Sequence, residues 1–341
     1  MDINRRKFFK LAGAAALTFA SGLPLMGCGE NKSAANAPPV EPAAQSVEGN
    51  TVVGDASSSK VYFSKTIDAD HLIELYDRIN GSIGGRVAIK VHSGEPHGPN
   101  ILSRDMVKAF QLKVPNSTII EANVAYGSAR GTTEAHRRTL ETNGWTFSKV
   151  DIIDADGDVN FPVNGGFHLK EVAMGAHLAD YDSMIVLTHF KGHSMGGFGG
   201  SLKNIAIGCA SGAVGKRQVH GLTDYGRWVT GGLFMELMAD SGKAICDHFG
   251  ERLVFINVMN RLSIDCDCTG TSAAKPTMAD IGILASTDIL AVDQACIDMV
   301  YAAPDSRDMI ERIESREGLR QLSAMEELGM GSRQYELITV D

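Results

Sequence analysis

Histidines, lysines and glycines are concentrated in one segment, 188–204, which reads T-H-F-K-G-H-S-M-G-G-F-G-G-S-L-K-N. Imidazole is a common metal ligand and the natural acid or base near neutral pH. Glycines let the backbone approach a ligand with its N–H groups exposed. Ser201 is expected to cap a helix, whose start would then favour an anion. The segment is either a working site or an ordinary glycine-rich turn with solvated histidines.

A second group of ligand-type residues is D-C-D-C at 265–268. In extended backbone, Cys266 and Cys268 point to the same side of the chain. Two thiolates on one side can hold a soft metal ion or the edge of an iron–sulfur cluster. The alternatives are two buried thiols, or a strained disulfide in an oxidising compartment.

Two further segments carry charged and imidazole side chains. K-V-H-S-G-E-P-H-G-P-N at 90–100 follows an apolar stretch and offers a lysine, two histidines and a glutamate. S-G-A-V-G-K-R-Q-V-H at 211–220 adds Lys216 and His220 as a second wall of the same site. The first could instead be a turn and the second a basic surface loop.

The elements that must position these residues alternate between strand and helix, which favours an α/β fold with a mainly parallel sheet flanked by helices. It would form one large domain or two intimate subdomains. Ligands of such sheets collect at the carboxyl ends of strands, where the segment 188–204 begins. The expected strands are 86–92, 117–122, 150–154, 182–188, 252–258, 280–285 and 335–340, and the expected helices are 103–112, 132–145 and 288–301.

The N-terminus has the pattern of an export signal over residues 1–28. N-R-R-K-F-F-K at 4–10 contains a twin-arginine pair, and a short apolar run leads to Cys28. Cys28 is predicted to be lipidated and to attach the protein to a membrane. The alternatives are simple cleavage or an uncleaved anchor. We expect an exported protein that lies in the periplasm or on the extracytoplasmic face of the membrane.

Residues 29–59 are predicted to be a flexible tether because they contain few large apolar side chains. The folded domain is expected over 60–341. Residues 1–27 carry a net charge of +3, so their removal would change the formal charge from −9 to −12. An acidic exported domain is a poor candidate for binding nucleic acid. A small-molecule substrate or a redox partner is expected instead.

Cysteine usage also suggests a cofactor. The chain has six cysteines, and a lipidated Cys28 would leave an odd number that cannot all be paired. The sequence has no C-x-x-C pair. The twin-arginine route carries proteins that are already folded, often with a cofactor inserted, which favours a metal ion or a redox cofactor.

These motifs together resemble the DUF362 family. The resemblance rests on K-V-H-S-G-E, on H-F-K-G-H with G-F-G-G-S-L-K-N-I-A-I-G-C-A-S, and on G-K-R-Q-V-H. It also rests on C-D-C followed by D-I-G-I-L-A-S-T-D-I-L-A-V-D-Q-A-C. It covers about residues 60–320. Many members carry an inserted ferredoxin and are described as iron–sulfur proteins, but this chain lacks that insertion.

A more remote resemblance is to the nickel-pincer lactate racemases. That family has a histidine, then G-[FY]-S-G-G-x-K-x-x-x-P-G, then a further histidine, and its lysine carries the pincer nucleotide. Here His193, Lys203 and His220 occur in the same order, and H-G-P at 97–99 is similar to the racemases' H-R-P. This chain has Ile207-Gly208 in place of the racemases' P-G.

Three hypotheses follow: a metal or redox-cofactor protein with a His/Lys/Cys site, a racemase- or epimerase-like enzyme with a lysine-tethered nucleotide and metal, and a lipid-anchored protein that binds an anion. The predicted catalytic residues are His97, His193 and Lys203. The predicted cofactor-binding residues are Gly197, Gly199, Gly200, Ser201, Lys203, Asn204 and Lys216. The predicted metal ligands are His189, His220, Cys266 and Cys268.

Overall fold

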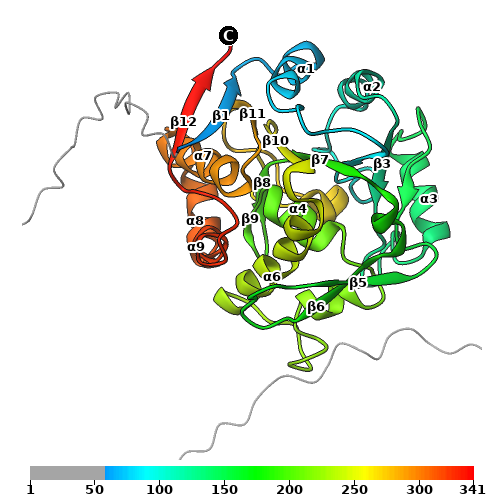
Figure 1. Ribbon diagram of the computed structural model, residues 1–341. Helices are drawn as coiled ribbons and strands as arrows, with labels where there is room; N and C mark the ends of the chain where they lie inside the picture. Colours follow the sequence, from blue (N-terminus) through cyan, green and yellow to red (C-terminus); the bar gives the residue numbers. More distant parts are fainter. Residues whose placement is uncertain (1–57) are drawn as a thin grey trace, which may run out of the picture. The chain divides into compact units, whose positions relative to one another are not determined.

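The protein is represented by a computed structural model that describes residues 58–341 (Figure 1). The predicted signal at 1–28 and the predicted tether, up to residue 57, lie outside the described residues. The described residues, 58–341, all belong to one compact unit. Across residues 58–341, no helix has the length and apolar character needed to cross a membrane.

The unit is an α/β fold built on an eight-stranded sheet in the order β12-β1-β11-β10-β7-β2-β3-β4. All neighbouring strands are parallel except the two pairs that involve β11. The predicted class, a mainly parallel sheet flanked by helices, is confirmed. The strands are β1 Ser59–Ser64, β2 Val87–Lys90, β3 Ser117–Glu121, β4 Asp151–Ile152, β7 Ser183–His189, β10 Leu253–Met259, β11 Gly282–Ser286 and β12 Tyr335–Thr339.

The central strands are apolar on both sides because helices cover both faces of the sheet. All seven residues of β7 are buried. Its Ile185 and Leu187 pack in one core cluster with residues of the first three helices, and its Met184 and Val186 pack in a second cluster with α4, α6 and α7. The helices are α1 Ala69–Asp77, α2 Arg104–Lys113, α3 Thr133–Thr142, α4 Ser201–Gly208, α5 Gly215–Val219, α6 Gly232–Phe249, α7 Ile289–Ala302, α8 Arg307–Ser315 and α9 Arg320–Glu327.

The chain leaves β2 and β7 in opposite directions across the sheet. In the sheet, β3 is the neighbour of β2 on one side, and β10 is the neighbour of β7 on the other side. The helices that follow them, α2 and α4, contribute to different core clusters and so cover opposite faces. Such a switch point opens a crevice at the carboxyl ends of the two strands. The fold therefore places a binding site beside the ends of β2 and β7.

The glycine-rich segment after β7 is a small hairpin rather than a loop. β8 (Lys191–His193) pairs with β9 (Gly197–Gly199), and α4 follows directly. A second hairpin pairs β5 (Asp158–Pro162) with β6 (Glu171–Gly175). Short 3-10 helices cover Ala176–Asp180, Gly250–Arg252 and Asp267–Ser272.

Candidate functional site

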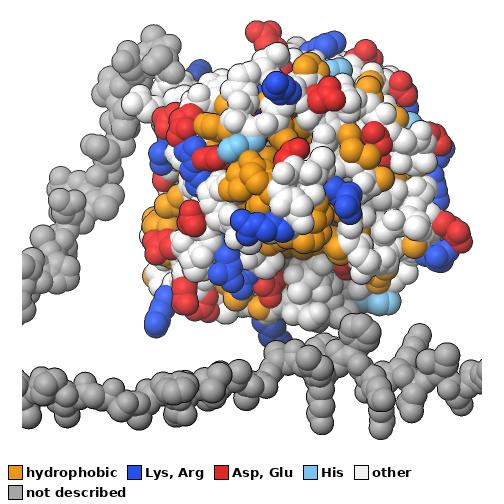
Figure 2. Space-filling view, turned by 90° about the horizontal axis from the view of Figure 1, so that it is seen from below, with side chains coloured by type: hydrophobic (Ala, Val, Ile, Leu, Met, Phe, Trp, Pro, Cys, Tyr) orange, Lys and Arg blue, Asp and Glu red, His pale blue; other side chains and the backbone are white. Residues whose placement is uncertain are grey.

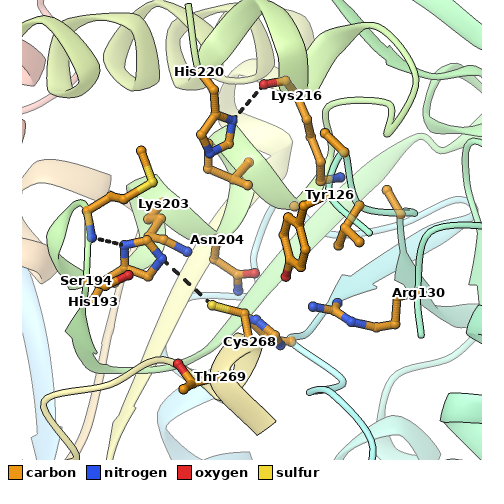
Figure 3. A pocket seen from close by; sticks show the side chains of 18 of the residues that line it. Tyr126, Arg130, His193, Ser194, Lys203, Asn204, Lys216, His220, Cys268 and Thr269 are labelled. Carbon is orange, nitrogen blue, oxygen red and sulfur yellow. Dashed lines mark hydrogen bonds between the residues drawn. The ribbon is translucent and has the colours of Figure 1, made fainter. Parts of the chain in front are cut away.

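Four neighbouring strands deliver the site at their carboxyl ends. Lys90 ends β2, Glu121 ends β3 and His189 ends β7, while the chain after β10 leads to the cysteine segment. Beside them lies a cavity of about 380 Å³. Figure 3 shows side chains that line it, which come from α4 and α5 and from the segments at or after the ends of β3, β8 and β10. The labelled residues around it are Tyr126, Arg130, His193, Ser194, Lys203, Asn204, Lys216, His220, Cys268 and Thr269.

The two cysteines of the D-C-D-C segment lie at the start of a 3-10 helix, so the backbone is extended at Cys266 but not at Cys268. Cys266 is the N-cap of this helix, and its sulfur accepts a hydrogen bond from the backbone N–H of Cys268 at 3.4 Å. A hydrogen bond from the Cys268 thiol lowers the pKa of Cys266 well below its usual value, despite burial, and raises the pKa of Cys268. The two thiols are therefore not equivalent, and Cys266 loses its proton more readily than Cys268.

His92, which follows β2, lies beside these sulfurs. Its Nε2 is 3.6 Å from the Cys266 sulfur. The ligand atoms of His92, Cys266 and Cys268 all lie within 4.8 Å of one another, close enough to hold one metal ion. The Nδ1 of His92 accepts a hydrogen bond from the backbone N–H of Gly94 at 3.0 Å. The neutral ring therefore carries its proton on Nε2, facing the sulfur.

His193, at the end of β8, is held in the same way. Its Nδ1 accepts backbone N–H groups of Gly196 at 2.9 Å and Met195 at 3.2 Å. Its Nε2 faces the Cys268 sulfur at 3.9 Å (Figure 3). Burial, together with the charge of Lys203, lowers the pKa of His193 well below its usual value. The ring is neutral, with a proton on Nε2 that it can donate into the cavity.

His220 has the opposite arrangement. Its Nδ1 lies 2.6 Å from the carbonyl oxygen of Lys216, so this nitrogen carries the proton and donates it. Nε2 is left with a free electron pair. Burial lowers the pKa of His220 to about 4. Its ring centroid lies 4.5 Å from that of Trp228, which fixes the ring in an edge-on contact. His220 can act as a base or as a metal ligand.

His189 was predicted to bind metal, but protein atoms occupy both of its ring nitrogens. Nδ1 lies 2.8 Å from a carboxylate oxygen of Asp267, and Nε2 lies 2.7 Å from the carbonyl oxygen of Asn260. Lys191 also pairs with Asp267, at 3.1 Å. Although burial opposes it, the charges of His189 and Lys191 hold the pKa of Asp267 well below its usual value. His189 thus anchors the residue between the two cysteines.

The start of α4 is occupied by an internal carboxylate. Gly200, and not Ser201, is the N-cap, and the Ser201 hydroxyl donates to Asn257. Asp293 accepts the backbone N–H groups of Ser201 at 2.8 Å and Leu202 at 3.0 Å. The expected anion site at this helix start was therefore wrong, because the helix dipole already faces Asp293. A Cβ on Gly200 would lie 2.5 Å from an Asp293 oxygen, so only glycine fits here.

Comparison with known proteins identifies the family. Residues 87–298 match the domain of unknown function DUF362. The chain belongs to the DUF362 family. The matched region runs from β2 to the middle of α7 and contains every segment that contributes to the site. No curated protein matches this DUF362 chain.

Two solved structures share remote similarity with this DUF362 chain. The lactate racemase apoprotein from Thermoanaerobacterium thermosaccharolyticum is 12% identical with a TM-score of 0.39, over 70% of this chain and 56% of that chain. A structural genomics target from Thermotoga maritima is 11% identical with a TM-score of 0.35, over 57% of this chain and 51% of that chain. The DUF362 chain thus spans about half the length of each.

The remaining predicted site residues of the DUF362 chain fall into two groups. Gly199, Gly200, Lys203, Asn204 and Lys216 line the cavity. His97 and Gly197 do not. His97 is exposed, and its backbone N–H donates to Asn143. Gly197 has a φ of 76°, and a Cβ there would lie 2.9 Å from Gly318. Its role is to let the hairpin pack against the segment after α8.

The sequence indicated His92 as one of the ligand-type residues of 90–100 but gave it no role, and Glu121 was not among the predicted site residues. Glu121 is buried, accepts both the N–H and the hydroxyl of Ser93, and pairs with Lys90 at 3.0 Å. Burial opposes its charge, but Lys90 and Arg130 lower its pKa well below the usual value. The signal available for both residues was their position at the carboxyl end of a strand.

Proposed function

We propose that this DUF362 protein binds a thiophilic metal ion, or the metal of a small redox cofactor, at Cys266 and Cys268 with His92 as a third ligand. One observation carries the proposal. Three ligand atoms from segments 174 residues apart in sequence meet within 4.8 Å at the carboxyl ends of the strands. Thiolate and imidazole are ligands that zinc, iron, nickel and copper accept. A fourth position would remain open toward the cavity, where a small-molecule substrate or a redox partner's group could bind.

The three ligands are not equal in this proposal. Cys266 loses its proton more readily than Cys268, and both thiols would be deprotonated on binding, as thiol ligands are. His92 would have to move its proton from Nε2 to Nδ1, and its hydrogen bond from Gly94 would then be lost. We therefore expect the two sulfurs to contribute most of the metal affinity and His92 to contribute less.

Elemental analysis of protein purified without oxygen, together with its visible absorption, tests the proposal. Cys266→Ser and Cys268→Ser should each lose the metal. Cys246→Ser is the matched control, because this thiol lies on α6, where burial raises its pKa to about 12, and it does not line the cavity. Wild-type protein that is folded by circular dichroism but contains no metal would refute the proposal.

Racemase- or epimerase-like proton transfer is a second candidate. The favouring observation is the pair of neutral histidines with opposite proton positions, His193 with a donor and His220 with an acceptor. Lys203 would be the attachment point of a nucleotide-type cofactor, and His220 would be its metal ligand. The mass of the intact native protein decides this, because an unmodified mass excludes a cofactor tethered at Lys203.

We further propose that the protein is exported and attached by a lipid at Cys28, which lies outside the described residues. The support is the twin-arginine pattern at 4–10 and the apolar run before Cys28. Cys28→Ala should move the protein from the membrane fraction to the soluble fraction. Replacement of Arg5 and Arg6 by lysine should retain it inside the cell. An unchanged distribution in both variants would refute the proposal.

A further inference from the structure

We propose that Lys203 and Lys216 form a subsite for an oxyanion, and that the cavity takes a small organic carboxylate or phosphate monoester whose apolar part lies against Tyr126 and Trp228. The subsite adds a ligand class to the proposed metal-binding function. It uses different residues and does not require that a metal be bound.

Lys203 is the first observation. Its side chain projects from the first turn of α4 into the cavity, and the residue is only 8% exposed. Among residues 58–341, its ammonium group has no hydrogen bond or ion pair. Its charge helps to lower the pKa of Cys266, but no hydrogen bond joins the two groups. A buried ammonium without a partner is costly. A bound anion would supply that partner.

Lys216 is the second observation. It lies in the first turn of α5 and is 4% exposed. Its ammonium donates one hydrogen bond, to the carbonyl oxygen of Ala210 at 2.7 Å. No carboxylate in the described part of the chain forms an ion pair with it. Both lysines line the same cavity, and both of their charges act on the ring of His220. Two donors of this kind suit one carboxylate or phosphate group.

The other cationic groups around the cavity already have carboxylate partners. Lys90 pairs with Glu121 at 3.0 Å, Arg130 pairs with Glu95 at 2.9 Å, and Lys191 pairs with Asp267 at 3.1 Å. Within each pair, the carboxylate neutralises the cationic group. The positive charge available to a ligand therefore comes from Lys203 and Lys216.

The remaining wall is apolar and aromatic, and the size suits a small molecule. Trp228 is 41% exposed and Tyr126 is 40% exposed, although both line the cavity. Met195 and Ile207 complete this wall. A volume of about 380 Å³ is at the lower end of the range for small-molecule sites. Figure 2 shows acidic and basic side chains mixed around hydrophobic ones on the outer face that it draws.

The test uses full-length protein and four probes: benzoate, phenyl phosphate, inorganic phosphate and benzyl alcohol. Binding is measured by calorimetry and by the fluorescence of Trp228. We expect benzoate, phenyl phosphate or both to bind, and benzyl alcohol to bind at least tenfold more weakly. Binding of benzoate alone would assign a carboxylate ligand, and binding of phenyl phosphate alone a phosphate monoester. If inorganic phosphate binds as tightly as phenyl phosphate, the apolar wall plays no part and that half of the proposal fails.

Variants separate the subsite from the metal site. Lys203→Met and Lys216→Met should each weaken anion binding at least tenfold, Lys203→Arg and Lys216→Arg should retain it, and the exposed Lys170→Met should have no effect. Metal content is measured on the same samples. Anion binding that survives both methionine variants overturns the proposal. So does anion binding that is lost in Cys266→Ser but kept in Lys203→Met, because the anion would then sit on the metal.

Discussion

At the scale of single residues, the site is defined by which atoms are left free after the protein has satisfied its own hydrogen bonds. Both ring nitrogens of His189 form hydrogen bonds with protein atoms. His92 and His193 accept backbone N–H groups at Nδ1, while His220 donates from Nδ1. Four histidines with similar sequence contexts therefore have three different chemical roles. Sequence alone predicts that His189, His193 and His220 gather, but the choice of nitrogen depends on backbone groups that only the folded chain brings near.

The pH dependence of anion binding is the prediction at this scale. Burial lowers the pKa of Lys216 to about 8, although Asp154 and Glu121 oppose the shift. The ammonium is cationic below that pH and loses its charge above it, so benzoate affinity should fall as the pH rises through about 8. Calorimetry from about pH 6.5 to 9.5 measures this. Lys216→Arg should keep its affinity over the same range, because guanidinium stays charged. Equal pH profiles for wild type and Lys216→Arg would contradict the assignment.

At the scale of elements, apolar strands were predictable and contacts between distant segments were not. The seven sequence-predicted strands are all present, and Ser103 and Asp288 cap their helices as the pattern suggests. The predicted strand 150–154 shortens to β4, since Asp154 turns its carboxylate to the backbone of Asn123 and Gly212. The prediction of Ser201 as a cap failed because the carboxylate that caps α4 is 92 residues away in sequence.

The contact between the β8–β9 hairpin and the cysteine segment gives the prediction at this scale. The Gly192 backbone N–H donates to Ser263 at 2.8 Å, and a Cβ on Gly192 would lie 2.3 Å from the carbonyl oxygen of Ile264. Gly192→Ala must push the hairpin away from Cys266, which we expect to cost about 1–3 kcal/mol of unfolding free energy and to lower metal content.

Urea unfolding and elemental analysis measure the two effects. Gly81→Ala is the control because a Cβ there would have no atom within 4 Å. We expect its unfolding free energy to stay within about 0.5 kcal/mol of wild type. A Gly192→Ala variant with wild-type stability and metal content would show that the hairpin does not position the cysteines.

At the scale of the whole molecule, the switch point that creates the cavity also buries many titratable groups. Burial lowers the pKa of His92, His136, His193 and His220. Each is neutral in the folded protein and gains a proton more readily when the chain unfolds. Their contribution to stability is therefore present above pH 6.5, their ordinary pKa, and is lost as the pH falls below it. The contribution of Asp293 to stability has the opposite pH dependence. Because burial raises the pKa of its carboxyl group to about 6, this contribution is lost as the pH rises.

His136 isolates this effect because it lies outside the cavity. It is completely buried on α3, and burial lowers its pKa to about 3. Its Nε2 has no hydrogen-bond partner among the residues that the structure describes. Between about pH 6 and pH 4, this one group should lower the unfolding free energy by up to about 1.4 kcal/mol per pH unit as the solution becomes more acidic. His136→Gln should make the fall shallower by that amount, whatever its effect on stability at pH 7. Urea unfolding at several pH values measures the slope, and the exposed His97→Gln should leave it unchanged. If the unfolding free energies of His136→Gln and wild type change equally with pH, His136 is protonated in the folded protein. The assignment of a neutral buried ring to His136 would then be wrong.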